Sequence, residues 1–304
     1  MARFSIRQSR GDRLFGAVNS LMLAAAFLVI VYPLIFVVSA SFSDPRAVAS
    51  GQMLLLPKGA TLLGYKRIFQ YREIWTGYAN TILYTCMGTL LNLAVTIPCG
   101  YALSRRDMPV RNALMVFFMI TMYFNSGIIP HYLNVRSMGL LNTRAILVIG
   151  GAVSVYNLII CRSFFSNSIP WAIQEAAYID GASDARTFFS IVLPLSKPIV
   201  VVIALYCAVA HWNSYFTAMV YIQNRRLFPL QLVLREILLQ SQATAAMIGA
   251  ATDAESVQYL YDQKNAADQI KYGVIVVSTL PMMLVYPWLQ SFFAKGVMIG
   301  SVKG

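Results

Sequence analysis

Long apolar runs separated by short polar segments dominate this chain. Six such runs extend over about 16–40, 78–103, 112–133, 144–166, 198–222 and 271–294. A helix of about 20 residues crosses a hydrocarbon layer of about 30 Å, and backbone groups in lipid must be paired within their own segment. Continuous runs do not suit the alternating strands of a membrane barrel. The pattern therefore predicts an all-α integral membrane protein with six transmembrane helices.

Composition supports a membrane protein and excludes an ordinary soluble domain. Of the 304 residues, 58% are hydrophobic and 12% are charged, whereas soluble domains carry about 25% charged residues. The first apolar run follows four arginines and could be mistaken for a secretory signal. It is longer than the apolar part of a signal, which spans about 7–15 residues, so we interpret it as a retained anchor.

Charge and cysteine usage are less informative. The net charge is +12, but with both termini cytoplasmic the basic residues divide equally between the two sides. The positive-inside rule therefore favours this orientation only weakly, through the four N-terminal arginines and the turn at 105–111. A basic outer surface favours an anionic substrate or an acidic partner; attraction to lipid headgroups explains it equally well. Cys86, Cys99, Cys161 and Cys207 lie within apolar runs without metal-ligand spacing, which indicates packing residues and no metal site.

Three segments interrupt or connect the apolar runs. The third run stops at Asn125-Ser126-Gly127 and resumes before Pro130, a break that membrane proteins tolerate where it faces protein or water. Residues 63–75 alternate apolar and charged positions, which predicts an amphipathic surface helix. Residues 223–270 form the longest polar connection. We interpret it as a partner-binding segment, with a merely solvated loop as the alternative.

A polar island at 167–197 predicts a helix–turn–helix on the membrane face. Pro170 suits the first turn of a helix, Gly181 suits its left-handed end, and Ser183 can cap a second helix over residues 185–191. On spacing alone, an ordinary interfacial hairpin explains the segment equally well. The island also contains Glu175-Ala176-Ala177, Gly181, Ile191, Leu193 and Pro194.

This pattern resembles the signature loop of binding-protein-dependent ABC importer permeases. Asn80-Thr81, Tyr101–Arg105 and His211–Phe216 further resemble segments of the maltose-type sugar permeases. Residues 126–130, 138–143 and 296–304 resemble the branch for complex oligosaccharides and polysaccharides, which includes alginate importers. Asn125-Ser126-Gly127 departs from that branch, where a glycine pair is expected.

The resemblance implies a type I ABC importer transmembrane domain in the inner membrane, with the island as a cytoplasmic coupling loop and both termini cytoplasmic. It implies a second, different permease chain, a pair of ATPase subunits that bind ATP and Mg²⁺, an external solute-binding protein, a saccharide cargo and surrounding lipid, and no nucleic acid. The coupling residues it implies are Glu175, Ala176, Ala177, Asp180, Gly181, Leu193 and Pro194. The chain then divides into a cytoplasmic N-terminal segment at 1–15, the first transmembrane helix with a periplasmic amphipathic connector at 16–77, the transmembrane core at 78–294, and a cytoplasmic tail at 295–304. The core contains the coupling loop at 167–197 and a periplasmic loop at 223–270.

The residues also limit how transport could be driven. The chain has no Gly-x-x-x-x-Gly-Lys-Ser/Thr phosphate loop, so we expect a non-catalytic subunit with no cofactor of its own. The six runs contain no Asp or Glu, whereas ion-coupled carriers place ionisable groups there. We therefore expect ATP hydrolysis by a partner. The alternatives are a self-contained secondary carrier or channel, and a membrane scaffold.

Polar and aromatic residues within the runs are candidates for the substrate pathway, because amides and hydroxyls bind sugar hydroxyls and aromatic faces stack on sugar rings. The candidates are Tyr123, Asn125, Asn157, His211, Trp212, Asn213 and Tyr215. The alternative is that such groups hold helices together by hydrogen bonds. We expect His211 to act as a hydrogen-bonding group, since no carboxylate lies near it in the sequence.

Overall fold

The computed structural model describes residues 9–124, 126–250 and 253–300, and within these ranges regular structure is helical, without strands. The chain forms two compact units. One unit extends to Gln70 and takes in Glu236–Val277, and the other comprises Tyr71–Arg235 and continues from Ser278. Two helices, α14 (Leu230–Ala250) and α15 (Ala254–Gly300), contribute residues to both units.

The first unit contains a long apolar helix, α1 (Arg10–Ser41), followed by α2 (Pro45–Ala49) and α3 (Leu63–Gln70). A capping box begins α1: the Ser9 hydroxyl accepts from the Asp12 amide at 3.1 Å, and the Asp12 carboxylate accepts from the Ser9 amide at 2.9 Å. The most apolar stretch of α1 has no buried residue. Its side chains therefore suit contact with lipid.

Polar contacts close the loop that follows α1. The Ser41 hydroxyl lies 2.8 Å from the Tyr65 hydroxyl, and the rings of Phe42 and Tyr65 are 5.0 Å apart. Helix α3 confirms the predicted amphipathic helix in part, because it ends at Gln70. Ile74 and Trp75, which we expected to extend that helix, lie in the next one.

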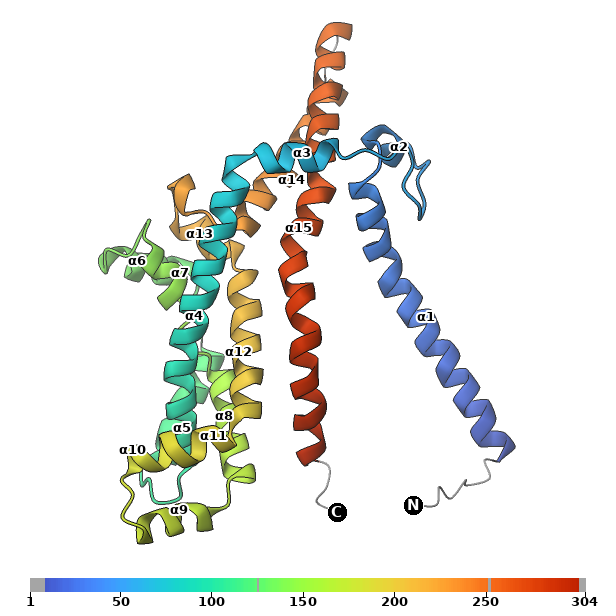
Figure 1. Ribbon diagram of the computed structural model, residues 1–304. Helices are drawn as coiled ribbons and strands as arrows, with labels where there is room; N and C mark the ends of the chain where they lie inside the picture. The colour runs from blue at the N-terminus through green and yellow to red at the C-terminus, as the bar shows by residue number, and fades with distance from the viewer. Residues whose placement is uncertain (1–8, 125, 251–252, 301–304) are drawn as a thin grey trace. The chain divides into compact units, whose positions relative to one another are not determined.

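The second unit is a bundle of interrupted helices. Its elements are α4 (Arg72–Ser104), α5 (Arg111–Tyr123), α6 (Ile128–Ser137), α7 (Arg144–Ile149), α8 (Val155–Ser168), α9 (Trp171–Ile179), α10 (Asp184–Arg186), the π-helical turn η1 (Thr187–Val192), α11 (Leu193–Leu195), α12 (Lys197–Trp212), α13 (Tyr215–Tyr221) and the 3-10 turn η2 (Arg225–Leu227). Helix α4 packs lengthwise against α8 and α12 (Figure 1). These three helices are the frame that positions the site.

Small residues on α4 allow this close packing. A Cβ atom at Gly100 would lie 2.8 Å from the sulfur of Cys161 on α8, and one at Gly88 would lie 2.4 Å from the His211 ring on α12. Around Cys161 lies an apolar cluster from α4, α8, η1 and α12 that includes Ile97, Phe165, Val192 and Ile203. Of the four cysteines predicted to be packing residues, Cys161 and Cys207 are buried, Cys99 is half-buried and Cys86 is exposed.

At one end of the bundle, polar residues of α4 bind the backbone of the turn around η2. The side-chain nitrogen of Asn80 donates to the backbone carbonyls of Arg226 at 2.8 Å and Phe228 at 3.1 Å. The Thr81 hydroxyl accepts from the backbone amide of Leu230 at 2.8 Å. Irregular backbone within an apolar bundle needs such partners. Asn80 and Thr81 therefore have an architectural role.

Among the described residues, two helices, α1 and α4, are long and apolar enough to cross a membrane alone. Two bent pairs would raise this number to four: α5 with α6, and Asp184–Leu195 with α12, which meet at 81°. The predicted break in the third run is confirmed, since α5 ends at Tyr123 and α6 begins at Ile128. The six-span count remains a prediction.

Two more runs are interrupted where the hydrophobic pattern was continuous. The run at 144–166 is two helices, α7 and α8, separated by a turn that contains Gly150 and Gly151. The run at 198–222 is also two helices, because Asn213 and Ser214 end α12 before α13 begins. Averaged hydrophobicity does not detect these breaks, since glycine and single polar residues hardly lower it.

Candidate functional site

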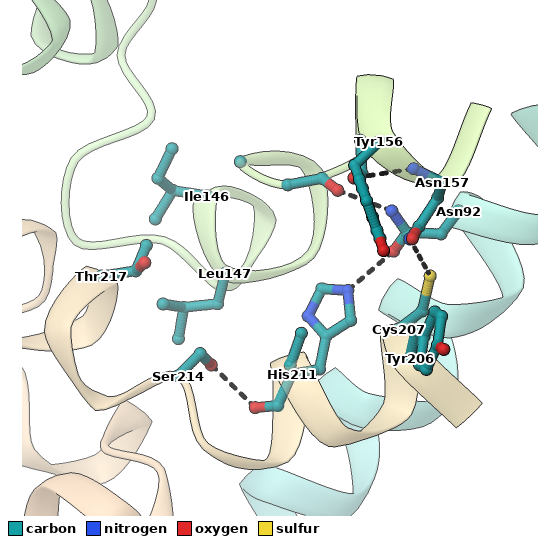
Figure 2. A pocket seen from close by; sticks show the side chains of 14 residues that line it. Asn92, Ile146, Leu147, Tyr156, Asn157, Tyr206, Cys207, His211, Ser214 and Thr217 are labelled. Atoms are coloured by element: carbon teal, nitrogen blue, oxygen red, sulfur yellow. Dashed lines mark hydrogen bonds between the residues drawn. The ribbon is translucent and has the colours of Figure 1, made fainter. Parts of the chain in front are cut away.

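A cavity of about 430 Å³ lies in the second unit, between α4, α8, α12 and the turn that follows α7 (Figure 2). Its polar lining is formed by Asn92, Ser154, Tyr156, Asn157, Tyr206, His211, Ser214 and Thr217. The described residues that line it include no Asp, Glu, Lys or Arg. The cavity is therefore a neutral site with both hydrogen-bond donors and acceptors.

Asn92 is the central polar group of this cavity. Its side-chain nitrogen donates to the carbonyls of Gly151 at 2.6 Å and Ala152 at 3.0 Å. Its oxygen therefore faces His211, whose Nε2 lies 2.8 Å away, and that nitrogen carries the proton that Asn92 accepts. Figure 2 shows this contact, which joins α4 to α12. The expectation that His211 acts as a hydrogen-bonding group is consistent with this geometry.

Asn157 and Tyr156 enter the cavity from the start of α8. The Ser154 hydroxyl caps this helix by accepting from the Asn157 amide at 3.4 Å. The Asn157 side-chain nitrogen lies 3.6 Å from the sulfur of Cys207 on α12. Asn157 is buried, whereas Tyr156 is exposed. The pair offers an amide held in position beside an accessible aromatic ring.

The lining includes Tyr156 and Tyr206, which sequence reasoning missed. Cys207 and His211 lie four residues apart on one face of α12, and Tyr206 and Ala210 form the adjoining row at the same spacing. That spacing was the available signal. For Tyr156, its position one residue before Asn157 gave no comparable signal, since adjacent helical residues point in different directions.

The structure separates the candidates that were adjacent in sequence. Trp212 is buried away from the cavity, where its Nε1 donates to the Ser278 carbonyl at 3.1 Å. Asn213 donates back to the Val209 carbonyl at 2.9 Å, so it caps its own helix. Both border a second hollow of about 270 Å³ that also contacts Thr279.

Tyr215 and Tyr123 line neither hollow. The Tyr215 ring lies beneath the Arg235 guanidinium, with 5.6 Å between the guanidinium carbon and the ring centre. Tyr123, at the end of α5, is 79% exposed. Asn125 lies outside the described residues. Within the described part of the chain, no group of three or more His, Cys, Asp or Glu side chains could hold a metal ion.

The polar island folds into two helical arms joined by a turn, with α9 on one side and α10, η1 and α11 on the other (Figure 1). Gly181 has a φ of +73°, the left-handed conformation expected of it. Its amide donates to the Tyr178 carbonyl at 3.0 Å, and the next amide donates to the Ala177 carbonyl at 2.9 Å, which ends α9. Ser183 caps α10 by accepting from the Arg186 amide at 3.3 Å.

The predicted coupling residues divide between the surface and the interior of this hairpin. Glu175, Ala176, Asp180, Gly181 and Pro194 are exposed. Ala177 is 4% exposed and packs inward, and Leu193 packs partly against the apolar cluster around Cys161. Beside the acidic residues, Ile179 is 86% exposed.

An ionic cluster connects this hairpin to the end of α4. Arg105, which follows α4, binds Asp107 in its own loop, the Tyr178 hydroxyl on α9, and Asp184 at the start of α10, with 2.6 Å between Arg105 Nη1 and Asp184 Oδ1. The Tyr178 hydroxyl also donates to Asp184 at 2.5 Å. Hydrogen bonds from Tyr178 and then Arg105 lower the pKa of Asp184. Sequence reasoning did not identify this cluster.

Comparison with known proteins identifies the family. Residues 74–299 match the model of the "Binding-protein-dependent transport system inner membrane component". The chain belongs to this family. It is therefore a membrane permease subunit, and its helical fold is that of a type I ABC permease.

Two relatives from Bacillus subtilis (strain 168) are similar to this permease over nearly its whole length. Protein LplC is 36% identical over 99% of this chain and 98% of its own. The polygalacturonan/rhamnogalacturonan transport system permease protein YtcP is 39% identical over 96% of this chain and 99% of its own.

A solved structure is similar in fold and sequence. It is a bacterial ABC transporter involved in the import of the acidic polysaccharide alginate. The permease matches one of its chains with a TM-score of 0.83 and 35% identity, over 95% of this chain and 100% of that chain.

Proposed function

We propose that this permease forms part of a membrane pathway that imports an oligosaccharide or polysaccharide. The observation that carries the proposal is the neutral cavity beside Asn92, Asn157 and His211. Amide, imidazole and hydroxyl groups can exchange hydrogen bonds with sugar hydroxyls, and the rings of Tyr156 and Tyr206 can contact sugar faces. Membership of the importer family does not favour a self-contained carrier or channel.

The cavity itself selects hydroxyl groups and not charge. Because the described lining includes no basic side chain, a uronate carboxylate would have no counter-charge from this permease within it. The transporter of similar structure is involved in the import of the acidic polysaccharide alginate. For this permease, alginate as the cargo is therefore supported by that similarity but not by the lining of the cavity. We propose a saccharide that is bound mainly through its hydroxyl groups and ring faces.

We further propose that the exposed hairpin docks into a separate ATPase subunit. Glu175, Ala176, Asp180 and Gly181 form its exposed tip beside Ile179. The permease would then assemble with a second permease chain, two ATPase subunits that bind ATP and Mg²⁺, and an external binding protein. In this arrangement the hairpin and both termini face the cytoplasm, and residues 223–270 face the binding protein.

Transport by the complete transporter in liposomes tests the pathway. Asn157→Leu should reduce saccharide uptake at least about fivefold, since one polar group left unpaired in a binding site costs about 1–3 kcal/mol. Asn213→Leu is the matched control, because it makes the same chemical change in the second hollow. If Asn213→Leu lowers uptake and Asn157→Leu does not, the assignment of the pathway to the cavity is wrong.

Co-purification with the ATPase tests the docking surface. Gly181→Pro should release the ATPase, because proline cannot adopt the φ of +73°, and Glu175→Lys should weaken binding by reversing an exposed charge. Gly139→Pro is the matched control: Gly139 also has a left-handed φ, of +68°, but lies in the loop after α6. Equal ATPase retention by all three variants would refute docking at the hairpin.

A further inference from the structure

The hairpin reaches two of the three framing helices through the chain itself. It follows α8 and precedes α12, so a displacement of the hairpin pulls on both directly. Helix α4 ends far earlier in the sequence, and the hairpin must act on it through non-covalent contacts. Helix α4 also carries Asn92, the residue that joins the cavity turn to His211. The contacts between α4 and the hairpin therefore decide whether hairpin movement reaches the cavity as a concerted change.

In the part of the chain that the structure describes, contacts of two kinds join α4 to the hairpin. Within the apolar cluster, the Tyr101 ring on α4 lies 5.1 Å from the Phe188 ring on η1. This contact is apolar and allows sliding. At the end of α4, Arg105 binds Tyr178 and Asp184 on both arms of the hairpin. The second contact is directional, since the planar guanidinium fixes the angles of the groups that it binds.

Arg105 is itself held firmly. Its side chain is 12% exposed, whereas that of Asp184 is 68% exposed. Its carbonyl accepts from Arg111 Nη1 at 3.0 Å, and the nearby Leu103 carbonyl accepts from Arg162 Nε at 3.1 Å. These two arginines satisfy carbonyl groups that the end of a helix leaves unpaired. Arg105 is thus anchored to α4 on one side and to the hairpin on the other.

We propose that Arg105 is a positioning residue that transmits movement of the hairpin to α4. The proposal rests on the proposed docking of the ATPase at the hairpin. Rigid elements with directional contacts move as one body, whereas an apolar contact alone lets them slide. From its end at Ser104 back to Asn92, α4 extends about 18 Å at 1.5 Å per residue. Loss of Arg105 should therefore uncouple ATP hydrolysis from the cavity and leave assembly intact.

The test compares saccharide transported per ATP hydrolysed in the complete transporter. In Arg105→Ala this ratio should fall at least about fivefold, because fivefold is the lower end of typical coupling between two sites. The ATPase should remain bound to this variant. Arg105→Lys should recover only part of it, because one ammonium cannot replace the guanidinium fork. Arg106→Ala is the matched control, since it removes the same kind of side chain from the next position of the loop, where that side chain is exposed.

Two variants on the hairpin keep the test decisive if Arg105→Ala folds poorly. Tyr178→Phe and Asp184→Ala each remove one contact to Arg105 from an exposed position. Both should lower the ratio, and adding either to Arg105→Ala should lower it no further. A wild-type ratio in Arg105→Ala, or loss of the bound ATPase from that variant alone, overturns the proposal. Full ATPase retention by Gly181→Pro and Glu175→Lys would instead refute the proposed docking.

Discussion

Gly88→Ala tests the contact between α4 and α12 that forms one wall of the cavity. The new Cβ would lie 2.4 Å from Cε1 and Nε2 of His211 and 2.7 Å from Nδ1. Ordinary contacts between such atoms are about 3.5–4.0 Å, so the ring must retreat by about 1 Å or more. The bond to Asn92, now 2.8 Å, would then exceed hydrogen-bonding distance.

The expected cost follows from these distances. Overpacking a close contact costs about 1–3 kcal/mol, and a hydrogen bond within a membrane bundle contributes about 0.6 kcal/mol. Replacing a helical glycine by alanine returns about 1 kcal/mol. The free energy of unfolding should therefore fall by about 0.6–2.6 kcal/mol, as measured by circular dichroism of the purified permease during titration with a denaturing detergent.

The background of His211→Ala provides the decisive comparison. Without the ring there is no clash, so Gly88→Ala should be neutral or stabilise the fold by up to about 1 kcal/mol. Gly16→Ala is the control, because Gly16 lies in α1 and its Cβ would have no neighbour within 4 Å. An equal cost of Gly88→Ala with and without His211 would refute the reasoning.

Two further predictions concern polar contacts outside the cavity. Hydrogen bonds lower the pKa of Asp184 in the folded protein below its usual 3.8, so its contacts stabilise the hairpin above that pH and are lost as the pH falls through the lower folded value. Protection of the backbone amides at the start of α10 from hydrogen exchange should therefore be constant over about pH 5–8. A loss of this protection between pH 7 and 5 would contradict the prediction. Asn142→Ala should lower the free energy of unfolding by about 1–3 kcal/mol. Asn142 has a left-handed φ of 57°, and its side-chain oxygen accepts from the backbone amides of Gln223 at 3.1 Å and Asn224 at 2.9 Å. Asn142→Asp, which keeps the acceptor, should cost less in the same detergent titration, and an equal cost would exclude this explanation.

The hairpin was the most predictable part of the site, because its signals are local. Gly181 ends α9 in the left-handed conformation, and Ser183 caps α10, since each requirement depends on a few neighbouring residues. Pro170 precedes α9 instead of lying in its first turn, a shift within the usual uncertainty of helix ends. Ala177 differs more, because burial depends on which face of α9 packs inward.

The cavity was predictable only in part. Asn157 and His211 were identified because polar groups are unusual within apolar runs, and the structure brings them to one cavity. The same reasoning grouped Trp212 and Asn213 with His211, although successive helical residues point about 100° apart. Which of them faces the cavity depends on where α4 and α8 lie around α12, and the sequence of α12 contains no such information.

The sequence by itself determined the features that arise from local preference and hydrophobic burial: a helical membrane protein, an interruption of the third apolar run, and a polar hairpin closed by Gly181. The tertiary structure decided which polar residues meet. Asn92 lies 59 positions from Gly151 and 119 from His211, and Arg105 lies 79 positions from Asp184. Contacts at such separations depend on the packing of whole helices, because each hydrogen bond forms only once α4, α8 and α12 are in place.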